Sequence, residues 1–281
     1  EGIVWLGTET GGVNKLSPRN TFIRNYTHDK RVERSISRNP VNVILEDQDG
    51  HLWIGTVEGG LNLKRKDEEH FVHFTASSTA QLSHNSVSAL SIDNKQRLWV
   101  GTWGYGVTLL DMNDPNKKAL KYINTGNNPS FSLDFVGALT FDKHNNGMWI
   151  GTNQGLFYFD LEKDSLQVPF SNNMSDHING IIGSIIDDDN KLWIGCNEGV
   201  YVIDLDSKTD ESFSYVHLKH KLDNPQSKLV EQITSFCIDS NGVLWLGSDG
   251  FGVYKRIIND DGSYTFQSYT TAHGLANNNV K

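Results

Sequence analysis

Two aromatic residues, Trp103 and Tyr105, are the strongest candidates for ligand binding in this chain. They stand on either side of Gly104 and are followed by Gly106, so the segment predicts a tight glycine turn that presents two large rings. Aromatic rings stack on the apolar faces of sugars, while carboxylates and amides bond to sugar hydroxyls. We therefore expect these rings to face a ligand. The alternative is that they pack between neighbouring structural units.

Other glycine turns of the chain carry acidic or amide side chains, which are suited to hydrogen bonding with a polar ligand. The predicted ligand-binding set therefore comprises Trp103, Tyr105, Glu58, Gln154, Glu198 and Asp249.

The ten histidines show no spacing that is typical of catalysis or metal binding. None stands in a His-Glu-x-x-His motif or beside paired cysteines. His70 and His73 alternate with Phe71 and Phe74, which favours solvent-facing positions on an outer strand over metal ligation. The sequence also lacks a Gly-x-Ser-x-Gly elbow and a phosphate loop. It therefore predicts no catalytic residue, no metal site and no cofactor.

Two further features suggest chemistry but have simpler structural explanations. The acidic triplet Asp187-Asp188-Asp189 would suit Ca²⁺, yet it falls in register with the hairpin turns of other repeats, which favours a turn. Cys196 and Cys237 both stand among apolar residues and are predicted to be small core residues. A disulfide between them is the less favoured alternative, and the redox compartment stays open.

One short sequence motif, the tryptophan phrase, recurs along the chain, and the structural repeat that it marks must position all of these residues. The phrase consists of a large apolar residue, tryptophan, an aliphatic residue, glycine and a small residue, and its tryptophans are 44 to 52 residues apart. This spacing is typical of a solenoid, a propeller or an array built from one supersecondary unit. The six copies of this tryptophan phrase are residues 4–8, 52–56, 98–102, 148–152, 192–196 and 244–248.

Each repeat carries signals for four strands. An apolar strand such as 41–45 leads into an acidic hairpin turn, whose first aspartate lies six residues before the tryptophan, or seven in the fourth repeat. After the tryptophan strand, a glycine turn leads to a third strand such as 60–64 and then to a fourth such as 71–75. Four antiparallel strands form one propeller blade, and no segment has the apolar period of a helix. The sequence therefore predicts an all-β β-propeller of six four-stranded repeat units.

The repeats give expected boundaries within a single propeller domain or fragment, 1–281. We expect repeats at about 1–39, 40–85, 86–132, 133–177, 178–229 and 230–273, with 274–281 as the inner strand of the next or closing blade. The chain starts and stops inside repeats, which indicates an excised or processed part of a longer protein. It would form either a closed six-bladed ring or part of a ring of about seven blades. Closure is narrowly favoured because an open array exposes apolar faces and strand edges.

Charge and hydropathy exclude some partners. The formal net charge of −9 argues against nucleic acid and against an anionic membrane surface. No apolar run is long enough to span a bilayer, so membrane attachment would come only through absent segments.

Propeller geometry predicts which loops share a face. The glycine turn after each tryptophan strand lies on the same face as the connections between blades, which are long and polar here. These connections are 27–39, 75–86, 124–133, 171–178 and 218–230, and the acidic hairpins fall on the opposite face.

The segment from Asp47 to Asn62 combines Asp-x-x-Gly-x-Leu-Trp-Ile-Gly-Thr with Gly-Gly-Leu-Asn. It resembles the two-component-regulator propeller repeat, and the likeness extends over all six units. That repeat fills the periplasmic sensor region of bacterial (Bacteroides-type) hybrid two-component histidine kinases. In this family, propellers precede a β-sandwich, a membrane helix, a kinase and usually a receiver with a DNA-binding domain. This chain contains only the propeller repeats.

The resemblance implies a non-catalytic sensor module that helps to sense oligosaccharides and relays the signal to transcription. It also implies a periplasmic location within an inner-membrane histidine kinase, and it leaves a homodimer formed through that parent open. Two rival classes are a propeller enzyme, either a lyase or a hydrolase, and a protein-protein interaction scaffold. The inner strands offer Asn42, Ser88, Ser184 and Thr234, which are poor acids and bases and argue against an enzyme.

Overall fold

The computed structural model describes residues 4–8, 12–17, 20–78, 81–114, 116–129, 133–169, 178, 180–207, 213–218, 232–275 and 277–280, with side chains from residue 25 onward. These residues form 23 β-strands and two short 3₁₀ helices, η1 (Leu205–Ser207) and η2 (Thr271–His273). No α-helix occurs in the described ranges.

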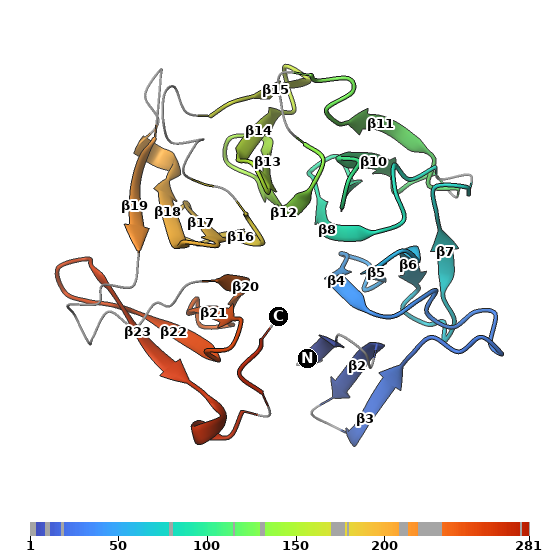
Figure 1. The fold of residues 1–281 in the computed structure, drawn as a ribbon, viewed down its shortest axis with the longest axis horizontal. Coiled ribbons are helices and arrows are strands. Elements are labelled where there is room, and N and C mark those ends of the chain that lie inside the picture. The colour runs from blue at the N-terminus through green and yellow to red at the C-terminus, as the bar shows by residue number, and fades with distance from the viewer. Residues whose placement is uncertain are drawn as a thin grey trace. The chain divides into compact units, whose positions relative to one another are not determined.

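The strands group into six sheets, each built from strands that are consecutive in the chain (Figure 1). The first sheet contains β1 (Val4–Thr8), β2 (Gly12–Ser17) and β3 (Asn20–Tyr26). The second contains β4 (Val41–Glu46), β5 (Leu52–Thr56), β6 (Gly60–Lys64) and β7 (Val72–Phe74). The third contains β8 (Val87–Ile92), β9 (Arg97–Thr102), β10 (Val107–Asp111) and β11 (Ala119–Ile123).

The remaining three sheets repeat the same four-stranded order. The fourth contains β12 (Val136–Asp142), β13 (Gly147–Thr152), β14 (Leu156–Asp160) and β15 (Ser165–Gln167). The fifth contains β16 (Gly183–Ile186), β17 (Lys191–Cys196), β18 (Gly199–Asp204) and β19 (Ser214–Leu218). The sixth contains β20 (Ile233–Ile238), β21 (Leu244–Ser248), β22 (Val253–Ile258) and β23 (Tyr264–Tyr269).

These sheets are the blades of an all-β β-propeller with four-stranded antiparallel blades, which confirms the predicted fold class. Five of the six predicted units have four strands. The first has three, because its tryptophan strand β1 begins at Val4 and the described residues include no strand before it. The chain divides into two compact units, residues 1–141 and 142–281, with the boundary at the end of β12.

The acidic hairpin holds the tryptophan of each phrase from the second onward. The indole Nε1 donates to Oδ2 of the turn's first aspartate at 2.8 to 3.2 Å in all five cases. In the second blade, Oδ1 of the same aspartate accepts backbone N–H groups two and four residues later, which closes the hairpin. The six-residue spacing therefore lets one carboxylate accept hydrogen bonds both from the backbone N–H groups of the turn and from the indole N–H of the tryptophan. The five pairs are Asp47–Trp53, Asp93–Trp99, Asp142–Trp149, Asp187–Trp193 and Asp239–Trp245.

The glycine of the phrase makes room for the next blade. A Cβ on Gly55 would lie 2.5 Å from Val87 Cγ1, and one on Gly101 would lie 2.6 Å from Val136 Cγ1. Val87 and Val136 begin the inner strands β8 and β12. Glycine is therefore required where the inner strand of the following blade packs against the tryptophan strand.

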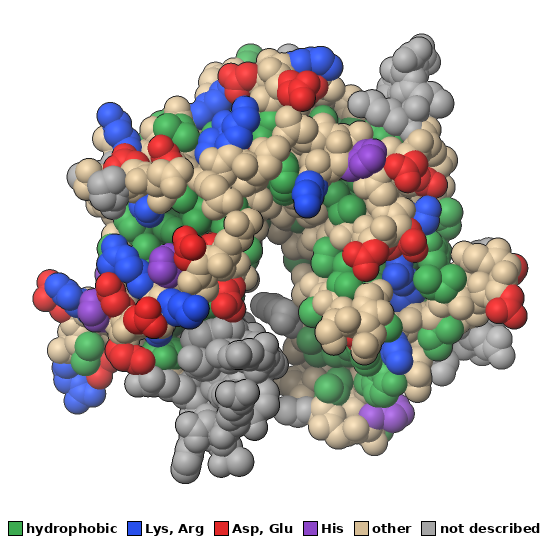
Figure 2. All heavy atoms as spheres, turned by 180° about the vertical axis from the view of Figure 1, so that it is seen from behind, with side chains coloured by type: hydrophobic (Ala, Val, Ile, Leu, Met, Phe, Trp, Pro, Cys, Tyr) green, Lys and Arg blue, Asp and Glu red, His purple; other side chains and the backbone are tan. Residues whose placement is uncertain are grey.

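Apolar side chains fill the space between consecutive blades. Trp53, Leu63 and Phe74 of the second blade pack with Leu90 and Leu98 of the third. Trp193 of the fifth blade packs with Leu244, Leu246 and Tyr254 of the sixth. Trp53, Trp99, Trp149 and Trp193 are at most 1% exposed, so these tryptophans serve the fold. On the face drawn in Figure 2, acidic and basic side chains are interspersed among the described residues.

Candidate functional site

The turn between β9 and β10 holds the two aromatic residues that the sequence singled out. Gly104 and Gly106 have φ angles of 109° and 72°, in the left-handed region that favours glycine. A Cβ on Gly106 would lie only 2.3 Å from the carbonyl oxygen of Ile123. Trp103 and Tyr105 are 44% and 56% exposed, so both rings are accessible to solvent, unlike the four buried tryptophans.

Two further aromatic residues extend this pair, and neither was predicted from the sequence. The ring of His84 stacks on Tyr105, with centroids 5.0 Å apart and an interplanar angle of 20°. The backbone of Phe135 forms a β-bridge with Trp103, and the Phe135 side chain is 49% exposed. We call Trp103, Tyr105, His84 and Phe135 the aromatic platform.

Hydrogen bonds through Ser86 connect the platform to the turn of the second blade. Ser86 accepts twice: its carbonyl oxygen receives the Trp103 N–H at 3.0 Å, and its Oγ receives the Glu58 N–H at 3.2 Å. On the other side, the Gly104 N–H donates to the carbonyl oxygen of Asp134 at 2.6 Å. Glu58, Trp103 and Tyr105 therefore lie at the same end of neighbouring blades.

An exposed ion pair lies at the turn of the neighbouring second blade. Arg38 Nη1 lies 3.0 Å from Glu58 Oε2, and both side chains are more than half exposed. Such exposed pairs contribute only about 0 to 1 kcal/mol to stability, so their groups can exchange this contact for ligand hydroxyls or a ligand charge at little cost. Arg38 was not predicted from the sequence because it lies in a connecting segment with no local signal.

The other three predicted ligand residues lie in the second unit. Gln154, Glu198 and Asp249 are all exposed and occupy the glycine turns of the fourth, fifth and sixth blades. Two of these turns are held by hydrogen bonds: the Gln154 N–H donates to Thr152 Oγ1 within its own turn at 3.1 Å, and the Asp249 N–H donates to the carbonyl oxygen of Gln232, just before β20, at 3.2 Å. The structure thus brings Glu58, Trp103 and Tyr105 together in the first unit and places each of the other three in a turn of its own blade.

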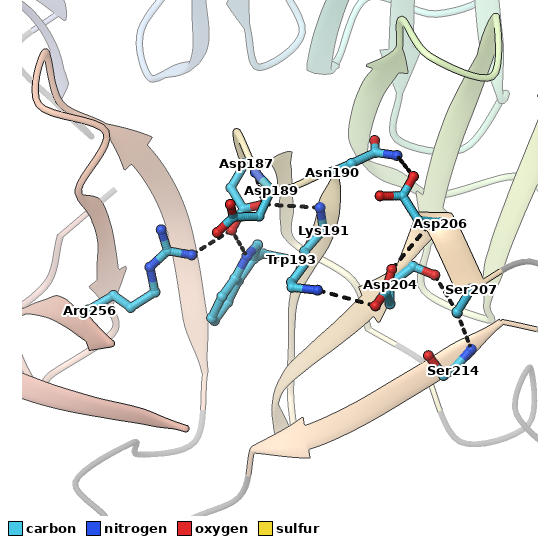
Figure 3. A network of polar contacts seen from close by, with 10 residues as sticks. All are labelled: Asp187, Asp189, Asn190, Lys191, Trp193, Asp204, Asp206, Ser207, Ser214 and Arg256. Carbon is cyan, nitrogen blue, oxygen red and sulfur yellow. Dashed lines mark hydrogen bonds and ion pairs between the residues drawn. The ribbon is translucent and has the colours of Figure 1, made fainter. Parts of the chain in front are cut away.

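The acidic triplet belongs to a hairpin, as the register predicted. Asp187 is buried and accepts hydrogen bonds from the Trp193 indole at 2.8 Å and from the Lys191 N–H at 3.0 Å (Figure 3). It also forms an ion pair with Arg256 of the sixth blade, whose guanidinium lies 5.2 Å from the centre of the Trp193 ring. Within the part of the chain that the structure describes, no group of three or more His, Cys, Asp or Glu side chains could hold a metal ion.

The prediction that both cysteines are core residues is half wrong. Cys196 is buried, but Cys237 is exposed, and neither forms a disulfide. Phe236 and Ile238 of β20 pack into the core, and alternation along the strand turns Cys237 to the opposite face.

Among the described residues, no helix has the length and apolar character needed to cross a bilayer.

Three segments, residues 35–58, 81–104 and 228–250, match the family model described as the two component regulator propeller. Comparison with curated proteins gave no significant match.

Several solved structures share the fold. The extracellular domain of a putative one-component system from B. thetaiotaomicron superposes with a TM-score of 0.71 at 19% identity, covering 95% of this chain and 35% of that one. The extracellular domain of a putative hybrid two-component system from the same organism gives 0.61 at 19% identity, with 95% and 42% covered. Virginiamycin B lyase from Staphylococcus aureus gives 0.65 at 12% identity, with 95% and 81% covered. The chain spans less than half the length of the first two proteins.

Proposed function

We propose that the chain is a non-catalytic sensor module that binds an oligosaccharide on the aromatic platform. Three of its segments match the two-component-regulator propeller repeat, and extracellular domains of a putative one-component and a putative hybrid two-component system share its fold. The observation that carries this proposal is the exposed ring pair Trp103 and Tyr105, extended by His84, with the Arg38–Glu58 ion pair at the neighbouring turn.

The rings are additions that the fold does not require. The corresponding turns of the second, fourth and fifth blades carry Glu58, Gln154 and Glu198 in place of an aromatic side chain, and their blades form normally. A pyranose presents an apolar C–H face that stacks on an aromatic ring, while its hydroxyls bond to charged and amide groups at the edge. The platform supplies the rings, and Arg38 and Glu58 supply a donor and an acceptor at the neighbouring turn.

The module would act in the periplasm as part of an inner-membrane hybrid histidine kinase, and would relay ligand binding to transcription. Two similar structures, which are extracellular domains of putative one-component and hybrid two-component systems, support this location. Relay requires that the ligand bind one conformational state of the parent more tightly than another. A homodimer formed through the parent would provide such states.

Bonding on the inner strands supports a non-catalytic role, although one protein of similar fold is a lyase. Asn42 Nδ2 donates to the carbonyl oxygen of Val87 at 2.9 Å, and Ser88 Oγ donates to that of Val136. Thr234 Oγ1 bonds in the same way to the carbonyl oxygen of Val280. These polar groups tie one blade to the next inner segment, so they are engaged in the scaffold and are poor general acids or bases.

A thermal-shift screen tests the proposal and separates it from a protein-interaction scaffold. The panel contains neutral and uronic-acid oligosaccharides. A ligand that binds only the folded state adds about 2.7 kcal/mol of stability at a concentration of 100 Kd. We expect one member at least to raise the Tm, and Trp103→Ala to reduce that rise.

The matched control is Leu120→Ala, which truncates a similarly exposed apolar side chain on β11 of the same blade. It should keep the full ligand-induced shift. A panel that leaves the wild-type Tm unchanged, or a Trp103→Ala variant that responds like the wild type, contradicts the proposal.

A further inference from the structure

The turn between β21 and β22 in the sixth blade repeats the geometry of the platform turn. Ser248 donates to the Gly252 carbonyl through its N–H at 3.0 Å and its Oγ at 2.9 Å. Thr102 makes the same two bonds to Gly106, both at 2.9 Å. Gly250 and Gly252 also have left-handed φ angles, of 86° and 84°. The two turns therefore share one backbone conformation.

The sequence of this turn repeats the aromatic pattern as well. Of the six glycine turns, only Trp103-Gly-Tyr105-Gly and Asp249-Gly-Phe251-Gly place an aromatic residue between two glycines. The Phe251 side chain is 46% exposed, close to the exposure of the Trp103 ring. Phe251 thus occupies in the sixth blade the place that Tyr105 occupies in the third.

The segment beside the turn is also matched. The Gly252 N–H donates to the Asn278 carbonyl at 2.8 Å, as the Gly106 N–H donates to that of Asp134. The next residue, Asn279, thus corresponds to Phe135, and its Oδ1 lies 3.9 Å from where a Cβ on Gly250 would stand. The Asn279 amide therefore lies beside the turn that carries Phe251.

From this correspondence we propose that the sixth blade carries a second carbohydrate site, formed by Phe251, Asp249 and Asn279, which takes a neutral sugar. The inference rests on the proposed function of the platform. The apolar face of the sugar would stack on Phe251, Asp249 would accept hydroxyl hydrogens, and the Asn279 amide would donate to a hydroxyl oxygen. Asp249 disfavours sugars that carry a carboxylate, because like charges repel.

Calorimetric titration with neutral trisaccharides tests this site on the whole chain. The probes are cellotriose, xylotriose, mannotriose and maltotriose, each short enough to report single sites. For the trisaccharide that binds, we expect two equivalents per wild-type chain, one for Trp103→Ala, one for Phe251→Ala and none for the double variant. Phe251→Tyr, which restores the residue found in the third blade, should keep two.

Ile258→Ala is the matched control, because it truncates another exposed apolar side chain of the same blade, on β22. It should keep two equivalents, and circular dichroism of every variant should match the wild type. A single equivalent that is lost in Trp103→Ala and kept in Phe251→Ala overturns the second site and leaves the proposed function intact. Binding of uronic-acid oligosaccharides alone likewise overturns the second site only. If no saccharide of either kind binds the wild type, both proposals are wrong.

Discussion

The two ends of each tryptophan strand differ in how much their residues vary from blade to blade. At the hairpin end, one aspartate recurs in all five blades from the second onward and bonds to the indole of its own blade. At the glycine-turn end, the side chain changes from blade to blade, from Glu58 and Trp103 to Gln154, Glu198 and Asp249, and is exposed. The recurrent residues of the repeat thus stabilise the scaffold at one end of the strand, and the residues at the other end vary, which is where we propose that a ligand binds.

The largest expected effect is at the hairpin end, in Asp187→Ala. The substitution leaves the buried Arg256 guanidinium and the Trp193 indole N–H without their shared acceptor. Removing one partner of a buried ion pair costs about 3 to 5 kcal/mol of the free energy of unfolding. Urea denaturation measures the loss, and Asp188→Ala in the same turn, where the side chain is exposed, is the control. If the two variants were equally stable, the aspartate at the hairpin end would not have the structural role assigned to it.

Gly101→Ala tests the close contact between the tryptophan strand of the third blade and the inner strand of the fourth. The new Cβ would lie 2.6 Å from Val136 Cγ1, so one blade or the other must shift. Overpacking of this kind costs about 1 to 3 kcal/mol. The same denaturation experiment on Gly126→Ala, at an exposed glycine, should show a much smaller change. A Gly101→Ala variant as stable as the wild type would mean that the glycine is not required by blade packing.

Trp103→Ala should separate binding from stability at the variable end. Because the ring is 44% exposed, we expect the free energy of unfolding to change by less than about 0.5 kcal/mol. Ligand affinity, measured by calorimetry, should fall by roughly 1 to 3 kcal/mol, the range for burying a large apolar side chain. A large loss of stability would instead identify Trp103 as a packing residue between blades.

The smallest effect is a pH dependence at the hairpin of the sixth blade. The pKa of Asp239 is lowered, first because its carboxylate accepts the Trp245 indole hydrogen bond and then through the N–H groups of Asn241 and Val243. Its contribution to stability is therefore present above the unfolded value of about 3.9 and is lost as pH falls through the lower folded pKa. Tm values for the wild type and Asp239→Asn should converge as pH falls below about 4. A gap that stays constant with pH would contradict this assignment.

The sequence by itself determined the repeat, its four strands and the glycine turn that carries Trp103 and Tyr105. These features could be predicted because each depends on residues close together in the chain: the aspartate reaches its tryptophan over six residues, and the turn needs only its own glycines. Local chemistry of this kind leaves a regular pattern along the chain.

Only the tertiary structure decided what surrounds the turn. His84 reaches Tyr105 from a connection 21 residues earlier, and Phe135 meets Trp103 from 32 residues later. Arg38 joins Glu58 from the segment before the second blade. The exposure of Cys237, likewise, follows from which face of β20 packs against its neighbours. These contacts depend on how one blade packs against the next. The spacing of residues within a single repeat does not show which residues of another segment will meet them.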